Sequence, residues 1–397
     1  MKKYVALVLA LVLCLSATLC LADGIAKEDI KIGMICLHDV KTGYDYNFME
    51  CLKTAMEELG LEEGKNYIIK QNVAEGADCT ETALDMIDEG CNIIFADSFG
   101  HGSYILEVAK EYPDVEFIHA TGTFAHTEQL ANYHDAFANI YQGRFLVGVA
   151  AGMKLNELKE AGKLKGEVPM IGYVGAFPYS EVISGFTSFY LGAKYVCPDV
   201  IMKVQYSGSW ADEKEEKSAA EALLALGCDL ISQHADTMGA PTACEDAGVP
   251  NVAYNLPTEG CDNTYLITSR IDWVPYIKYI VNQKVNGEAI ANDYCGTFDD
   301  GMVKITAANP QVAVEGTDEK LAELQVALQS GELQVFDTAT FTVNGETLTE
   351  YLADVDDFGD YAPETQVISD GYFHESEYRS APYFNLYIDG VEALNMN

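Results

Sequence analysis

Basic residues are scarce in this chain. Its 397 residues contain 24 lysines and arginines against 62 aspartates and glutamates, which gives a formal net charge of −38 at pH 7. Nucleic-acid binding needs a basic face that neutralises phosphates. Docking on anionic lipid also needs positively charged side chains. The composition therefore argues against both kinds of partner, and the acidic excess is typical of a solubilising charge spread over helix surfaces.

Several motifs that carry catalysis or cofactor binding are also missing. No two cysteines have the two-residue spacing of a metal or redox motif. There is no phosphate-binding glycine loop and no Gly-x-Ser-x-Gly elbow. These absences argue against a phosphorylated ligand and a serine hydrolase, and we expect no cofactor and no metal.

Cysteine itself is present, and nine of the eleven residues follow position 22. Most of the nine lie in apolar segments, which predicts buried and unreactive thiols. So many thiols on an exported chain suit a reducing habitat, with disulfides as the alternative.

The one long apolar run stands at the beginning of the chain. It extends from Tyr4 to Leu21 after Met1-Lys2-Lys3, which is the pattern of an export signal over residues 1–22. Cleavage after Ala22 and lipid attachment at Cys20 are both open. Either predicts an extracytoplasmic protein, in the periplasm or at the cell surface, that is free or anchored to the membrane.

The remaining sequence repeats one order of elements. Strands alternate with helices of 3.6-residue period, and glycines end several of the helices. The predicted strands are 32–37, 66–73, 92–96 and 116–120, then 170–175, 201–206, 229–233 and 251–254; the predicted helices are 46–59, 80–88 and 104–111, then 181–196, 213–226 and 240–247. This alternation predicts an α/β protein with two doubly wound lobes of parallel strands, as does a length beyond what one core supports.

Domain boundaries follow from the repeat. We expect residues 29–141 and about 266–300 in lobe 1, and residues 142–265 and about 301–335 in lobe 2. Residues 336–397 alternate acidic and aromatic residues, and we expect them to pack across the hinge.

Ligands of doubly wound sheets bind beyond the carboxyl ends of the strands. Two facing lobes therefore place one cleft between their strand ends. Tyr44 in the first loop and Trp210 after the strand 201–206 could sandwich a flat ligand. Asp39 and Asn47 offer polar groups beside Tyr44, although Asn47 is equally suited to capping the next helix.

Further candidates follow other strand ends: Phe99 in lobe 1, and His234, Asp236 and Asn255 in lobe 2. A His-x-Asp pair suggests a metal or a catalytic dyad, but no third ligand is recognisable nearby. We therefore expect His234 and Asp236 to contact the ligand or to cap the loop. Arg144, at the start of an apolar helix, is expected to bond carbonyls at the lobe junction.

Several stretches between about residues 31 and 287 resemble the basic membrane protein family, whose members are substrate-binding proteins of ABC importers. They are Gly43-Tyr44-Asp45-Tyr46-Asn47, Asp97-Ser98-Phe99-Gly100, 112–122, 142–148, Ser209-Trp210-Ala211-Asp212, Gln233-His234-Ala235-Asp236 and Asp272-Trp273-Val274-Pro275-Tyr276. The resemblance implies a type I periplasmic-binding-protein fold with hinged lobes, a purine base or nucleoside held between aromatic rings, and an ABC permease as partner.

Two positions depart from the family pattern. Tyr44 stands where Trp is frequent, so a smaller ring remains for stacking. Asn255 stands where nucleoside-binding relatives carry an Asp that holds ribose, which favours a free base.

From the resemblance and the missing catalytic motifs together, we expect a monomeric binding protein rather than an enzyme. The alternatives are a same-fold receptor for a sugar or riboflavin, and an exported nucleoside hydrolase that would use Asp39, Asp45 and Asp236.

Overall fold

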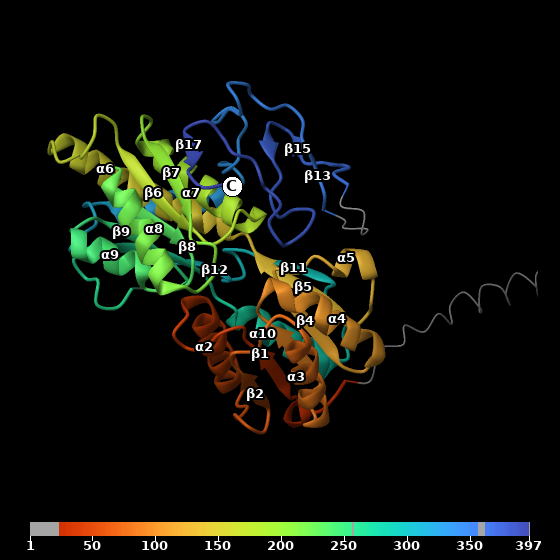
Figure 1. Cartoon of the computed structure of the whole chain (residues 1–397). Coiled ribbons are helices and arrows are strands. Elements are labelled where there is room, and N and C mark those ends of the chain that lie inside the picture. Colours follow the sequence, from red (N-terminus) through yellow and green to blue (C-terminus); the bar gives the residue numbers. More distant parts are fainter. Residues whose placement is uncertain (1–23, 256–257, 356–361, 397) are drawn as a thin grey trace, which may run out of the picture.

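The computed structural model describes residues 24–255, 258–355 and 362–396. The predicted export signal, with Cys20, lies outside them. The described chain forms two lobes with a loop-rich C-terminal segment beside them (Figure 1).

Lobe 1 is built on a six-stranded parallel sheet of order β11-β5-β4-β3-β1-β2. Its strands are β1 (Ile32–Ile35), β2 (Tyr67–Lys70), β3 (Ile93–Ala96), β4 (Glu116–Ala120), β5 (Tyr133–Ala138) and β11 (Asp293–Gly296). Its helices are α2 (Gly43–Glu58), α3 (Ala77–Asp88), α4 (Gly102–Glu111), α5 (Ala125–Glu128) and α10 (Val274–Asn286). Every residue of β1, β3 and β5 is buried, as expected for a sheet covered on both faces.

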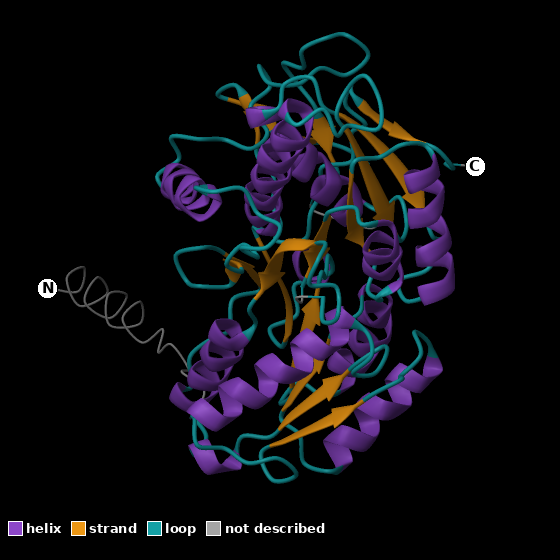
Figure 2. Ribbon diagram, turned by 90° about the vertical axis from the view of Figure 1, so that its left-hand side faces the viewer, coloured by secondary structure: helices purple, strands orange, loops and turns teal. Residues whose placement is uncertain are grey.

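Lobe 2 repeats this plan in a seven-stranded sheet of order β12-β10-β9-β8-β6-β7-β17, parallel except for β12. Its strands are β6 (Met170–Gly175), β7 (Ile201–Tyr206), β8 (Leu230–His234), β9 (Asn251–Tyr254), β10 (Tyr265–Ile271), β12 (Val303–Ile305) and β17 (Val391–Ala393). Its helices are α6 (Ile140–Glu160), α7 (Ser180–Val196), α8 (Glu213–Ala225), α9 (Gly239–Ala247) and α11 (Thr317–Gln329). Helices lie on both sides of the strands in each lobe (Figure 2).

The predicted fold class and internal repeat are confirmed. Every strand and helix expected from the repeat overlaps an observed element of the same type. The repeat did not include five further strands that extend the two sheets: β5, β10, β11, β12 and β17. The expected lobe boundary at residue 266 differs from the structure, because β10 pairs with β9 and so belongs to lobe 2.

Within the described residues, the chain crosses between the lobes three times. The crossings run from β5 to α6, from β10 to α10 and from β11 to β12. Trp273 lies at the second crossing, where its buried ring stacks on Phe48 of α2 with centroids 4.5 Å apart. This packing anchors the hinge in the core of lobe 1.

The C-terminal segment extends lobe 2. Its strand β17 pairs with β7, and Phe336, Phe373 and Phe384 join the core that α6 and α7 form. Four short strands complete it: β13 (Leu352–Ala353), β14 (Thr365–Gln366), β15 (Ile368–Ser369) and β16 (Tyr372–Phe373). The segment touches lobe 1 where the backbone N–H of Ser380 donates to Asp293 Oδ2 at 2.7 Å.

The nine cysteines of the described residues are free thiols, and eight of them are buried. Within the described ranges, no helix has the length and apolar character needed to span a bilayer.

Candidate ligand-binding cleft

A cavity of about 40 Å³ lies between the lobes where the strand ends meet. Counted from the first strand of each lobe, β1 or β6, both sheets contain the strand order 2-1-3-4-5. In sheets of this order the ligand-binding crevice opens beside the first strand, at the switch point where the strand order reverses. The cavity lies between the switch points of the two lobes. Its lining residues are Leu37, His38, Tyr44, Asp45, Ser98, Phe99, Thr121, Glu181, Trp210, His234, Asp236 and Tyr254.

Tyr44 forms the lobe 1 side of the cavity. It lies in the first turn of α2, and its hydroxyl donates to the carbonyl of Asp97 at 2.9 Å. Its ring meets Phe48 edge-on with centroids 5.0 Å apart, and Phe48 in turn stacks on Trp273. The ring is therefore held from behind by the core of lobe 1.

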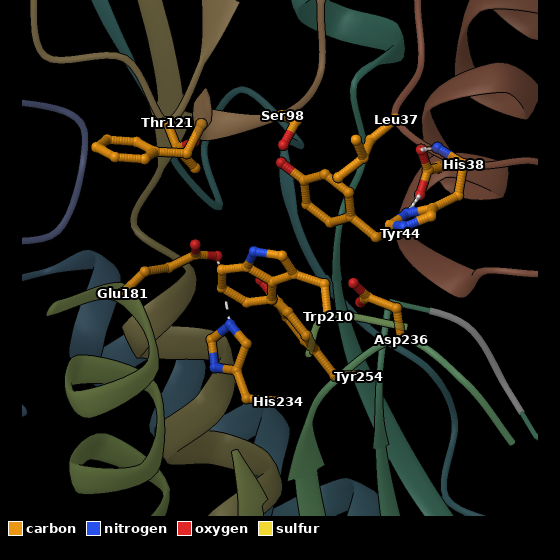
Figure 3. Close-up of a pocket in the computed structure, with 12 residues that line it drawn as sticks. Leu37, His38, Tyr44, Ser98, Thr121, Glu181, Trp210, His234, Asp236 and Tyr254 are labelled. Carbon is orange, nitrogen blue, oxygen red and sulfur yellow. Dashed lines mark hydrogen bonds and ion pairs between the residues drawn. The ribbon is translucent and has the colours of Figure 1, made fainter. Parts of the chain in front are cut away.

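Trp210 faces Tyr44 from the other lobe (Figure 3). It lies in the loop after β7, and its carbonyl accepts a hydrogen bond from the backbone N–H of Asp236 at 2.9 Å. Phe177 and Tyr179 pack against the indole with centroids 5.4 and 6.1 Å away. Two supported rings, one from each lobe, thus line the same cavity.

Carboxylates stand at the edges of this space. Asp236 points into it (Figure 3), and burial raises the pKa of its carboxyl well above the usual value, helped by Asp45, Glu216 and Glu181. A ligand N–H or O–H that donates to Asp236 would relieve this cost. The cavity therefore favours a ligand with hydrogen-bond donors on its edge.

Glu181 and His234 form a pair on the opposite side. His234 Nε2 lies 3.3 Å from Glu181 Oε1. Burial lowers the pKa of His234, although Glu181 opposes this effect, so the imidazole is neutral at pH 7. Arg144 donates to the carbonyl of Gln233 at 2.9 Å and lies over the ring of Tyr254, so these contacts lie within lobe 2 rather than at the expected lobe junction.

A buried acidic group lies beneath Tyr44. Ligand-type atoms of Cys36, Asp45 and Asp97 lie within 4.8 Å of one another, a grouping that could hold a metal ion and that the sequence did not reveal. Burial alone would raise the pKa of Asp45, but hydrogen bonds from His38 and Thr42 lower it. Burial and the neighbouring Asp45 raise the pKa of Asp97 well above its usual value. The two neighbouring carboxyls therefore differ in acidity, and Asp45 ionises at lower pH than Asp97.

Five of the eight predicted site residues line the cavity: Tyr44, Phe99, Trp210, His234 and Asp236. The other three, Asp39, Asn47 and Asn255, do not, and local hydrogen bonds explain their places. Asp39 accepts from the backbone N–H of Lys41, which is an Asx turn. Asn47 donates to the carbonyl of Ile271 at the hinge instead of capping its helix.

Asn255 follows β9 with a φ of 63°. Asparagine tolerates this left-handed conformation, and the residue's backbone N–H donates to the carbonyl of Ser269. Its side chain is buried beside the strands rather than among the cavity-lining residues.

Seven residues that line the cavity are not among the eight predicted site residues: Leu37, His38, Asp45, Ser98, Thr121, Glu181 and Tyr254. Glu181 lies in the first turn of α7, after the loop that follows β6, and Tyr254 is the last residue of β9. A wider reading of the strand-end rule, which takes in the last strand residue and the first helical turn, would have included both.

One backbone hydrogen bond joins the lobes beside the cavity. The N–H of Gly43 donates to the carbonyl of Asp236 at 2.8 Å. A ligand pocket usually measures about 300–1,000 Å³, far more than the 40 Å³ between these lobes. The cavity is therefore too small for a ligand of that size as the lobes stand, and binding requires its walls to move apart.

Comparison with known proteins agrees with this architecture. Residues 32–336 match the model of the Bmp family, described as ABC transporter substrate-binding protein PnrA-like. The chain belongs to this family. Bmp proteins bind a small molecule and pass it to an ABC permease, and family members work outside the cytoplasm.

Two relatives are each 32% identical to this Bmp protein. One, from Brucella abortus, is named a purine-binding protein; the match covers 78% of this chain and 84% of the relative. The other, from Haloferax volcanii, is named a putative ABC transporter glucose-binding protein; that match covers 63% of this chain and 60% of the relative.

A solved solute-binding protein of an ABC transporter system from Conexibacter woesei has the same fold. It superimposes with a TM-score of 0.63 at 20% identity, over 77% of this chain and 98% of that one.

Proposed function

We propose that this protein captures a purine base or nucleoside between Tyr44 and Trp210 and delivers it to an ABC permease. The observation that carries the proposal is the pair of facing rings, one from each lobe, with Asp236 and Glu181 at the edges. A purine is flat, so it stacks well. Its N–H groups are the donors that these carboxylates accept.

Binding would proceed by lobe closure. The open form admits the ligand, and the contacts made only in the closed form favour closure. Neutral His234 holds Glu181 in place at one edge, while Asp236 accepts from the ligand at the other. No covalent step is required for this role.

A sugar is the second candidate ligand. The Haloferax volcanii relative that is named a putative glucose-binding protein has the same 32% identity to this chain as the purine-binding relative. A sugar also stacks on aromatic rings. A sugar stacks through its C–H groups, whereas a purine presents an aromatic face to each of the two rings, so the facing pair favours a purine.

The proposed state of the protein is a monomer that does not bind nucleic acid. It would work outside the cytoplasm, either lipid-anchored at Cys20 or released by cleavage after Ala22. The mass of the mature protein from membranes and from medium distinguishes the two forms.

The test is a thermal-shift screen of the mature protein against purine bases, nucleosides, riboflavin and sugars. A ligand that binds only the folded state raises Tm by mass action. We expect a shift with a purine, and its loss in Trp210→Ala while Trp210→Phe retains part of it. A shift with a sugar or riboflavin alone would overturn the proposal.

Hydrolysis is checked in the same preparation. Incubation with inosine should leave the nucleoside intact by chromatography. Release of hypoxanthine in proportion to protein concentration would instead support an exported hydrolase.

A further inference from the structure

A second cavity, of about 330 Å³, opens directly beside the first. We call it the side chamber. It shares Phe99, Thr121, Glu181 and Trp210 with the cleft cavity. Because these four residues line both cavities, a ligand whose flat part lies between the rings could reach the side chamber past their side chains.

The C-terminal segment builds the outer wall of the side chamber. Arg379, Ala381, Pro382 and Asn385 line it. All four lie beyond residue 336, where the match to the Bmp family ends. The outer wall of the side chamber therefore comes from residues outside the family match.

Two nitrogens of the Arg379 guanidinium form no hydrogen bond among the described residues. Its side chain is largely buried, its Nε donates to the carbonyl of Ala381 at 3.4 Å, and its Cζ lies 5.9 Å from the ring centroid of Tyr383. Among the described residues, no hydrogen bond or ion pair to its Nη1 or Nη2 is formed. A guanidinium held in a cavity with free N–H groups is suited to ligand oxygens.

Asn385 adds a second donor. Its Oδ1 accepts from the hydroxyl of Tyr351 at 2.6 Å, which leaves the amide N–H₂ for another partner. Thr121, Ser180 and Glu181 supply hydroxyl and carboxylate groups on the other walls. The polar lining thus offers both donors and acceptors, which is what a polyhydroxylated group requires.

The segment is fixed against lobe 1 next to Arg379. Asp293 Oδ2 accepts from the backbone N–H of Ser380 at 2.7 Å and lies 2.8 Å from His126 Nε2. We call this contact of His126, Asp293 and Ser380 the clasp. It holds the C-terminal wall of the side chamber against lobe 1, and it can form only while the two lobes are together. The clasp therefore completes the side chamber in the closed form.

We propose that the side chamber takes the ribose of a nucleoside whose base lies between Tyr44 and Trp210, with Arg379 donating to the sugar oxygens. The inference rests on the proposed function and makes it more specific, since it selects a nucleoside over a free base. Glu181 borders the chamber and the chain carries a charge of −38, so a phosphate is disfavoured there.

The experiment is calorimetric titration of the full mature chain with hypoxanthine, inosine and inosine 5′-monophosphate. We expect wild type to bind inosine at least about tenfold more tightly than hypoxanthine. Arg379→Ala should weaken inosine binding by about tenfold or more and leave hypoxanthine binding within about twofold. Lys159→Ala, which removes an exposed cation paired with Asp199, is the matched control and should change neither.

The outcomes separate the two proposals. Binding of hypoxanthine but no gain with inosine would overturn the side chamber as a ribose site and leave the proposed function standing. Tighter binding of the monophosphate than of inosine would show that Arg379 selects an anion, against the inference. Equal loss of base and nucleoside in Arg379→Ala would assign Arg379 to folding or closure. Failure of wild type to bind any purine would reject the proposed function itself.

Discussion

Glu216 illustrates how one buried carboxyl makes stability depend on pH. The side chain is fully buried on α8 beneath the cleft loop, and its Oε2 accepts from the backbone N–H of Thr237 at 3.2 Å. Burial raises the pKa of Glu216 to about 7, although the hydrogen bonds from Thr237 and its neighbours lower it in part. A folded-state pKa above the unfolded value stabilises the fold at low pH, and this contribution is lost as pH rises from about 4.5 to about 7.

Glu216→Gln tests this expectation, because the amide stays neutral at every pH. The free energy of unfolding of wild type should fall relative to that of the variant by roughly 3 kcal/mol between pH 4.5 and pH 8. Urea denaturation at both pH values measures it. Glu221→Gln, an exposed position on the same helix, should show no such difference; parallel pH curves for wild type and Glu216→Gln would contradict the assignment.

At the scale of elements, α6 and α7 pack with their backbones in contact. A Cβ on Gly148 would lie 2.1 Å from the carbonyl oxygen of Phe189, and one on Gly192 would lie 2.0 Å from that of Phe145. These two glycines therefore face the partner helix reciprocally. They let the apolar helix after the first crossing lie flat against α7, which supports Glu181 at its first turn.

Gly192→Ala should destabilise the protein by about 3 kcal/mol, because the added methyl group meets backbone that cannot yield without separating the helices. Chemical denaturation measures the loss. Gly166→Ala is the control, since its Cβ would meet the carbonyl oxygen of Val168 at 3.8 Å, and it should change stability by less than about 0.5 kcal/mol. Equal stability of the two variants would show that α6 and α7 can separate at little cost.

At the scale of the whole molecule, polar contacts on two sides of the cleft join the lobes in the closed form. The Gly43–Asp236 backbone bond lies on one side, and the clasp of His126, Asp293 and Ser380 lies on the other. The C-terminal segment thus belongs to lobe 2 by its core and touches lobe 1 through the clasp. Opening of the cleft must break both contacts.

Asp293→Ala should loosen the C-terminal segment without unfolding the lobes. We expect amide hydrogen exchange in residues 376–385 to become about tenfold faster, because the charge-assisted hydrogen bonds of the clasp are lost. Asp299→Ala is the control, since this exposed carboxylate bonds Gln329 away from the clasp. Unchanged exchange in Asp293→Ala would mean that the core contacts of Phe336 and Phe384 alone hold the segment.

The alternation of strands and helices was predictable because it depends on local patterns. Apolar runs such as Ile32–Ile35 and Ile93–Ala96 are buried on both faces in the sheet, and a run of that kind has few other solutions. The strand-end rule then located Tyr44, Phe99, Trp210, His234 and Asp236 without any coordinates. Strand β5 was not predicted because Tyr133–Ala138 contains His134 and Asp135, polar residues that are buried only through tertiary contacts.

The sequence by itself determined two doubly wound lobes, an aromatic and acidic cleft and membership of a binding-protein family. Only the tertiary structure decided that Asn47 serves the hinge, that Glu181 reaches the cleft, and that Arg379 lines a chamber beside Trp210. The physical reason is range. Periodicity and strand ends follow from neighbouring residues, whereas a hydrogen bond from Asn47 to Ile271 or a wall shared by Trp210 and Arg379 joins positions more than 150 residues apart, and no local pattern specifies their distance.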